Sequence, residues 1–107
     1  MSAEGVGAKA AEIASRVLAG MTSPILAARE LSGLLLSLGC DLEDPDYRTF
    51  VGIDSETDAL PVGKARQRWA SSALAEKAPD IERAERWALD FGKEAFTNVI
   101  ARFGKAV

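Results

Sequence analysis

Apolar residues recur at intervals of three and four along the first stretch of the chain, which is the spacing of one face of an α-helix. The residues of this stripe are Ala10, Ile13, Ala14, Val17, Leu18 and Met21. Glu12 and Arg16 stand one helical turn apart on the opposite side, where they can form an ion pair. We therefore predict an amphipathic helix over residues 1–20, ending near Gly20.

A second helix is predicted over residues 22–39 from its own start and stop signals. Thr22 or Ser23 can cap the free amides of the first turn, and Pro24 suits the first helical position because an N–H would have no partner there. A broad stripe of alanines and leucines follows. Gly39 then stands where a left-handed residue commonly ends a helix.

The last part of the chain contains the longest helical pattern. Residues 64–78 favour one or two short helices, and Pro79 is predicted to open a long helix over 79–103. Its apolar stripe consists of Ile81, Ala84, Ala88, Phe91, Ala95, Val99 and Phe103. Gly92 interrupts this helix at a cost of about 1 kcal/mol relative to alanine, so we expect a bend or a close helix crossing there.

These patterns predict one all-α domain of 107 residues, built as a small bundle of three to four amphipathic helices. Residues 40–63 are predicted to form a long acidic loop between the second and third helices. The loop has a single base, Arg48, and seven acids: Asp41, Glu43, Asp44, Asp46, Asp54, Glu56 and Asp58. A loop of this length is more often functional or mobile than incidental.

Four apolar side chains interrupt the acidic segment and are expected to anchor it on the core. They are Tyr47, Phe50, Val51 and Ile53. Because the run TFVGI has a β-favouring composition, a short strand at this point stays open as an alternative.

Composition excludes several kinds of chemistry. The chain has no histidine, which removes serine triads, HExxH metalloproteases and cysteine–histidine proteases within this chain. Neither GxxxxGK[ST] nor GxGxxG occurs, so no nucleotide-binding motif is present. Cys40 is the single cysteine and cannot form an internal disulfide; we interpret it as a small apolar residue at a helix end.

The net charge of −3 favours basic partners and gives no support for binding to nucleic acid or to an anionic membrane. The N-terminal stretch lacks the basic start and continuous apolar core of a signal peptide. No apolar run approaches the ~20 residues that span a bilayer. We expect a cytoplasmic protein without a cofactor.

The alternating carboxylates raise the hypothesis of a metal site. Asp54, Glu56 and Asp58 match the first alternating positions of an EF-hand loop, but Ala59 and Ala65 stand where that loop needs glycine and glutamate. Oxygen ligands for Mg²⁺ or Mn²⁺ could still be gathered from the loop, so a carboxylate-dependent metal enzyme stays open. In the structural alternative, these acids cap turns or are neutralised by the bases that follow, Lys64, Arg66 and Arg68.

The stretch DPDYRTFVGIDSETDALPVGKARQRWA, with the earlier ARELSGLLLSLG and the later DIERAERWA, resembles a family of small uncharacterised bacterial proteins. It is also similar to immunity-type proteins that are encoded beside secreted toxins. The resemblance covers residues 24–103 and implies that the following residues belong to the family's central motif: Asp54, Ser55, Glu56, Asp58, Leu60, Pro61, Gly63, Arg66 and Trp69. It implies no enzymatic activity for them.

The charge pattern and the resemblance together favour a non-enzymatic protein-binding domain. In this hypothesis the acidic loop neutralises a basic partner, such as a toxin, by blocking its active site. The predicted partner-binding residues are Asp44, Asp46, Tyr47, Asp54, Glu56, Asp58 and Trp69, with Phe50 as a further apolar anchor. The alternative is a helical binding or regulatory module that forms a homodimer through an apolar helix face.

Overall fold

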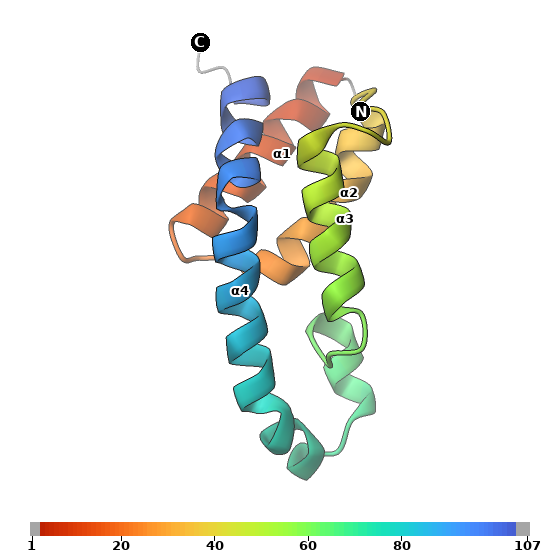
Figure 1. Cartoon of the computed structure of the whole chain (residues 1–107), viewed down its shortest axis with the longest axis vertical. Coiled ribbons are helices and arrows are strands. Elements are labelled where there is room, and N and C mark those ends of the chain that lie inside the picture. The colour runs from red at the N-terminus through yellow and green to blue at the C-terminus, as the bar shows by residue number, and fades with distance from the viewer. Residues whose placement is uncertain (1–2, 105–107) are drawn as a thin grey trace.

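The computed structural model describes residues 3–104, and all regular structure in this range is helical. Helix α1 spans Ala3–Leu18, α2 spans Pro24–Ser37 and α3 spans Pro45–Thr57. A 3₁₀ helix, η1, spans Gly63–Arg68, and α4 spans Ser71–Phe103 (Figure 1). The all-α class predicted from the sequence is confirmed.

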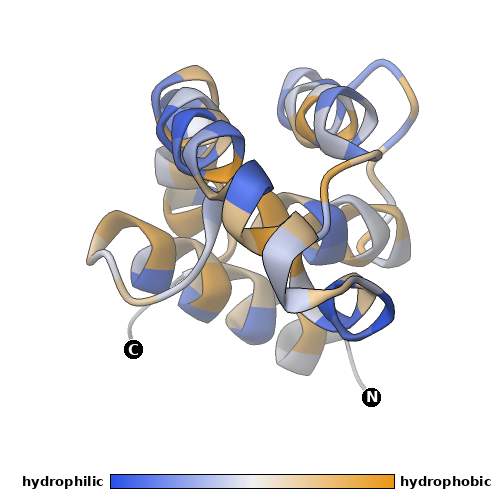
Figure 2. Ribbon diagram, turned by 90° about the horizontal axis from the view of Figure 1, so that it is seen from below, coloured by the Kyte–Doolittle hydropathy of each residue, from blue (hydrophilic) through white to orange (hydrophobic). Residues whose placement is uncertain are grey.

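Helices α3 and α4 lie side by side and run in opposite directions, with α1 and α2 packed behind them (Figure 1). Hydrophobic residues gather where the helices face one another, and hydrophilic residues lie on the outer sides (Figure 2). The largest fully buried side chains of this core are Phe50, Phe96, Ile25, Leu31, Leu35 and Ile53. The molecule is elongated, with extents of 47 × 25 × 24 Å.

The ends of α1 and α2 follow the signals in the sequence. The Ser23 hydroxyl accepts a hydrogen bond from the Leu26 N–H at 3.2 Å, and Pro24 occupies the first helical position. At the other end of α2, Gly39 has a positive φ of 87°, and the Cys40 N–H donates back to the Leu35 carbonyl at 3.0 Å. This pattern is the Schellman motif that glycine permits.

The predicted acidic loop is largely wrong, because residues 45–57 form helix α3. Asp44 caps this helix: its Oδ1 accepts hydrogen bonds from the Asp46 N–H at 3.0 Å and from the Tyr47 N–H at 3.1 Å. Pro45 follows at the first helical position, as Pro24 does in α2. The same run that favours a strand, TFVGI, is therefore helical.

Three of the four apolar side chains expected to anchor this segment do so. Phe50 and Ile53 are completely buried and stand three residues apart on one face of α3. Tyr47 is half-buried and packs against the core, whereas Val51 is exposed on the outer side. Burial of one face makes a helix out of a sequence with weak intrinsic helix propensity.

Helix α4 begins at Ser71, well before the predicted start at Pro79, which lies inside the helix. A proline in a helix removes the hydrogen bond to the carbonyl four residues earlier, here that of Ala75. Both Ala75 and Pro79 are exposed, so water can satisfy that carbonyl. The predicted short helices over 64–78 correspond to η1 and the first turns of α4.

The close helix crossing expected at Gly92 is present between α3 and α4. A Cβ atom at Gly92 would lie 2.8 Å from Cε2 of Phe96 and 2.9 Å from Cδ1 of Ile53. The absence of a side chain at Gly92 thus lets α4 lie close to the buried face of α3. Because the two helices are so close, their outer sides form one continuous surface.

Candidate protein-binding surface

Two of the predicted binding carboxylates lie instead in an ion-pair network that ties the start of α3 to the end of α4. Arg102 Nη2 lies 2.9 Å from Asp44 Oδ2, and Arg102 Nη1 donates to Asp46 Oδ2 at 3.0 Å. Asn98 Nδ2 donates to the other oxygen of Asp46 at 3.0 Å. The side chains of Asp44 and Asp46 are only 14% and 9% exposed. They are engaged within the chain and have little surface for a partner.

The electrostatics of this network follow from its contacts. Burial raises the pKa of Asp44, but hydrogen bonds from Arg102 and from the Tyr47 and Asp46 N–H groups outweigh burial, so the pKa lies below its usual value. The hydrogen bond to Asp44 raises the pKa of Arg102. Burial raises the pKa of the Cys40 thiol, which therefore stays protonated at neutral pH.

Asp54 has a second structural partner, Arg29 on α2. Arg29 Nε lies 3.1 Å from Asp54 Oδ1, although this Nε–H is not aimed at the carboxylate and the contact is an ion pair without a hydrogen bond. Arg29 Nη2 also donates to the Thr57 carbonyl at 2.7 Å, in the last turn of α3. A cation at this place interacts favourably with the helix dipole. Arg29 therefore holds the C-terminal end of α3 against α2.

The remaining predicted site residues are not brought together. Glu56 and Asp58 are exposed and have no ion pair with any residue between 5 and 104. Trp69 is 37% exposed just after η1, and Tyr47 packs against the core near the other end of α3. Phe50, proposed as an anchor for a partner, is completely buried, so that prediction is wrong.

An exposed aromatic pair that sequence reasoning missed lies on α4. The rings of Trp87 and Phe91 stack at 14° to one another with centroids 5.1 Å apart. Trp87 is 37% exposed and Phe91 is 51% exposed, although the helical stripe placed Phe91 in the core. A Cβ at Gly52 would lie 3.6 Å from Cε2 of Phe91, so the Phe91 ring lies next to the backbone of α3 at this glycine.

The position of Gly52 relates the two helices along this surface. Because α3 and α4 run in opposite directions, Glu56, one turn after Gly52, comes level with Trp87, one turn before Phe91. On the other side of Phe91, Thr49 and Glu94 line a hollow of about 150 Å³ together with Asp46 and Asn98. We call this surface the α3–α4 face; it consists of Thr49, Gly52 and Glu56 on α3 and Trp87, Asp90, Phe91 and Glu94 on α4.

The α3–α4 face carries three unpaired carboxylates, although Arg86 and Lys93 stand within one helical turn of Asp90. Glu56, Asp90 and Glu94 are exposed, and none forms an ion pair within the described residues. Asp90 and Glu94 are one helical turn apart, a spacing at which like charges destabilise a helix slightly. A cationic group placed beside Phe91 would relieve this repulsion.

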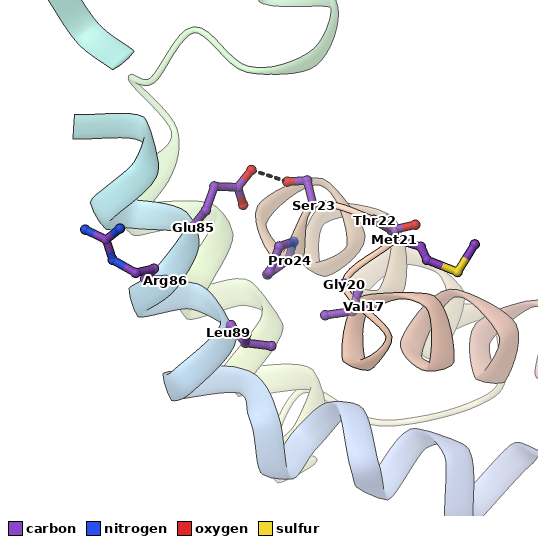
Figure 3. A pocket seen from close by; sticks show the side chains of 9 residues that line it. All are labelled: Val17, Gly20, Met21, Thr22, Ser23, Pro24, Glu85, Arg86 and Leu89. Atoms are coloured by element: carbon purple, nitrogen blue, oxygen red, sulfur yellow. Dashed lines mark hydrogen bonds between the residues drawn. The ribbon is translucent and has the colours of Figure 1, made fainter. Parts of the chain in front are cut away.

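A larger hollow, with a volume of about 370 Å³, lies elsewhere, between α4 and the turn that joins α1 to α2 (Figure 3). Glu85 accepts a hydrogen bond from the Ser23 hydroxyl at 2.5 Å and another from the Ile25 N–H at 3.1 Å. Arg86 points away from this contact (Figure 3). Both carboxylate oxygens of Glu85 thus accept hydrogen bonds from residues at the start of α2. We therefore interpret Glu85 as a residue that holds α2 against α4, and not as a ligand-binding group of this hollow.

Three further findings bear on the function classes. Among the described side chains of residues 5–104, Cys, Asp and Glu nowhere form a group of three or more that could hold a metal ion. None of the described helices is long and apolar enough to cross a membrane. Comparisons with protein-family models, with curated proteins and with solved structures gave no match.

Proposed function

We propose that this protein is a non-enzymatic protein-binding domain that recognises a basic partner through its α3–α4 face. The observation that supports this proposal above all is the stacked pair of Trp87 and Phe91, half-exposed beside unpaired carboxylates. A stacked, preoriented aromatic pair loses little conformational freedom on binding, and aromatic residues are enriched among those that dominate interface energies.

The carboxylates give the surface its preference for a cation. Glu56, Asp90 and Glu94 have no internal partner among the described residues, whereas Asp44, Asp46 and Asp54 are occupied by arginines. Unpaired charges at the rim of an interface chiefly speed association and select the partner, while buried aromatic contacts hold it. The partner is therefore a protein that presents an apolar side chain flanked by lysine or arginine.

A basic toxin is the partner that the sequence resemblance favours. In that form of the proposal the domain is an immunity protein that covers a cationic, substrate-binding cleft. The chain's net charge of −3 fits this role. Of the residues predicted from the sequence, Glu56 belongs to the binding surface, and the exposed carboxylates of Asp41 and Asp58 add to the electrostatic attraction for a basic partner. Trp69 follows η1 and is not part of this face.

A pull-down from a lysate of the native cells tests the proposal. The tagged wild type is washed at low salt and at about 0.5 M salt, where screening weakens exposed charge pairs. We expect one basic protein that is bound by the wild type, removed by the high-salt wash and absent with the Phe91→Ala variant. Leu36→Ala, which truncates an exposed apolar residue on α2, is the matched control and should bind as the wild type does.

Charge variants complete the test. Asp90→Asn with Glu94→Gln should lower recovery of the partner, whereas Glu12→Gln with Glu82→Gln makes the same change in net charge away from the α3–α4 face and should not. Capture of no basic protein, or equal capture by Phe91→Ala and by the wild type, contradicts the proposal.

A further inference from the structure

The small hollow beside Phe91 has apolar walls and polar walls. Its volume is about 150 Å³. Pro45 of α3, together with Phe91 and Ala95 of α4, forms the apolar walls, and the other residues that line the hollow are polar. A cavity of this size holds a group of about six non-hydrogen atoms. The hollow is therefore large enough for one side chain of a partner, and side chains that fill such pockets contribute most to interface energies.

The polar walls present oxygen atoms that can accept hydrogen bonds. The Thr49 hydroxyl donates its hydrogen to the Pro45 carbonyl at 3.0 Å, so toward a ligand it can only accept. Asn98 Nδ2 donates to Asp46 Oδ1 at 3.0 Å, and no described residue donates to the side-chain carbonyl of Asn98. The exposed carboxylate of Glu94 has no partner among the described residues. A hydrogen-bond donor with a positive charge suits these groups best.

The charges around the hollow do not balance within the described chain. Asp46 is buried, and its Oδ2 lies 3.0 Å from Arg102 Nη1. The same guanidinium also pairs with Asp44, whose Oδ2 lies 2.9 Å from Arg102 Nη2. One cation thus serves two carboxylates, and Glu94 adds a third that it does not contact. A further cation in the hollow would therefore be attracted.

The other bases near this surface leave the hollow free. Arg48 of α3 pairs with Glu43 at 3.1 Å. Lys93 follows Phe91 by two residues and Arg86 precedes it by five, so both lie about 140–160° round α4 from Phe91 and the hollow. Neutralisation of the acidic segment by the bases of η1, considered from the sequence, is not found either. These bases form no ion pair with the described residues: Lys64, Arg66 and Arg68.

We propose that this hollow is the anchor site for one lysine side chain of the basic partner. The ammonium group binds the Glu94 carboxylate and the Thr49 hydroxyl oxygen, and the four-carbon stem packs along Phe91. Lysine fits better than arginine, because its ammonium is compact, whereas the planar guanidinium is wider and holds its donors in a fixed fork. This inference rests on the proposed function, since the hollow belongs to the α3–α4 face, and it names the residue type that the partner presents there.

An amide chemical-shift titration of the isotope-labelled full chain with n-butylammonium chloride tests the site at constant ionic strength. This ion has the stem and charge of a lysine side chain. We expect saturable shifts of the Thr49 and Glu94 amides and none at Leu36, on the exposed side of α2. n-Butanol, which has the same stem without the charge, should bind about tenfold more weakly or worse. n-Propylguanidinium should also bind more weakly than n-butylammonium.

Two variants with the same change in charge separate the hollow from the rest of the face. Glu94→Gln should raise the dissociation constant for n-butylammonium about fivefold or more, because an amide does not replace the charged contact. Asp90→Asn removes an equally exposed carboxylate of the α3–α4 face outside the hollow and should change this constant less than about twofold. Thermal unfolding checks that both variants fold as the wild type does.

Three results would overturn the lysine site. They are shifts that still rise linearly at about 0.2 M n-butylammonium, equal effects of Glu94→Gln and Asp90→Asn, and tighter binding of n-propylguanidinium than of n-butylammonium. Each of these results leaves intact the capture of a basic protein by the α3–α4 face. Conversely, saturable binding of n-butylammonium at Glu94 with no basic protein captured from the lysate would contradict the proposed function alone.

Discussion

Helices α2, α3 and α4 each contain one glycine, and the surroundings of these three glycines differ. Gly33 of α2 has no atom within 4 Å of where a Cβ would stand, Gly52 of α3 has only the Phe91 ring at 3.6 Å, and Gly92 of α4 meets two buried side chains below 3.0 Å. The cost of glycine in a helix is about 1 kcal/mol relative to alanine at each site. The local environment decides whether alanine recovers that energy.

Gly92→Ala should therefore destabilise the protein while Gly33→Ala stabilises it. The added methyl group at Gly92 must displace Phe96 and Ile53, and such overpacking costs about 1–3 kcal/mol, which exceeds the gain in helix propensity. At Gly33 the gain of up to about 1 kcal/mol remains. Urea unfolding followed by circular dichroism measures both changes. A Gly92→Ala variant that is more stable than the wild type would contradict the close crossing of α3 and α4.

The contact between Arg102 and Asp44 makes stability depend on pH. Because the pKa of Asp44 is lower in the folded protein than its ordinary value of 3.8, the contact contributes fully above about pH 5 and is lost as pH falls through the lower, folded pKa. We expect the wild type to lose stability relative to Asp44→Asn between about pH 5 and pH 2. Asparagine still caps a helix, so this variant removes only the charge. Parallel pH curves for the two proteins would contradict the ion pair.

Arg102 is the basic residue of the same network, and its substitution gives a second test. Arg102→Ala should lower the free energy of unfolding at neutral pH by about 2 kcal/mol, the range of a lost charged hydrogen bond, because Asp46 stays buried without its cation. Arg48→Ala removes an exposed arginine that pairs with Glu43 and should change stability by less than about 1 kcal/mol. Equal effects of the two substitutions would mean that the network at Arg102 is no stronger than a surface pair.

Among the helices, α1, α2 and the later part of α4 could be predicted from the sequence, because each has an apolar stripe and a recognisable end. Helix α3 could not be predicted, because its acidic residues suggested a solvated loop. The arginines that pair with these acids, Arg29 and Arg102, are distant in the sequence. One signal was available: Asp44 and Pro45 repeat the cap and first-turn proline of Ser23 and Pro24.

The first turns of α4 should be weakly protected against amide hydrogen exchange. None of residues 64–80 is buried, and Pro79 removes one helical hydrogen bond, so this segment can open without disrupting the core. Amide hydrogen exchange should be much faster over 71–80 than over 92–100. Pro79→Ala should slow exchange in 71–80 while changing global unfolding by less than about 1 kcal/mol. Equal protection of both segments in the wild type would contradict local opening.

For the molecule as a whole, the sequence showed that acidic residues are concentrated between residues 41 and 58, but it did not show which of them form ion pairs in the fold. Asp44, Asp46 and Asp54 hold helices together, and Glu56 and Asp58 remain exposed. The exposed pair of Trp87 and Phe91 could not be predicted from the periodicity of α4. The position of this pair depends on the absence of a side chain at Gly52, next to Phe91, and on the close approach of α3 and α4 at Gly92. Both are properties of the tertiary structure.

The affinity of the purified basic partner for the wild type, compared with its affinity for Phe91→Ala, tests the role of the α3–α4 face most directly. Calorimetric titration at low salt, with Leu36→Ala as the control, provides the comparison. We expect Phe91→Ala to raise the dissociation constant at least about tenfold with unchanged folding, because the exposed ring is the centre of the contact. Equal dissociation constants for the three proteins would show that the partner binds elsewhere and would contradict the assignment of this face.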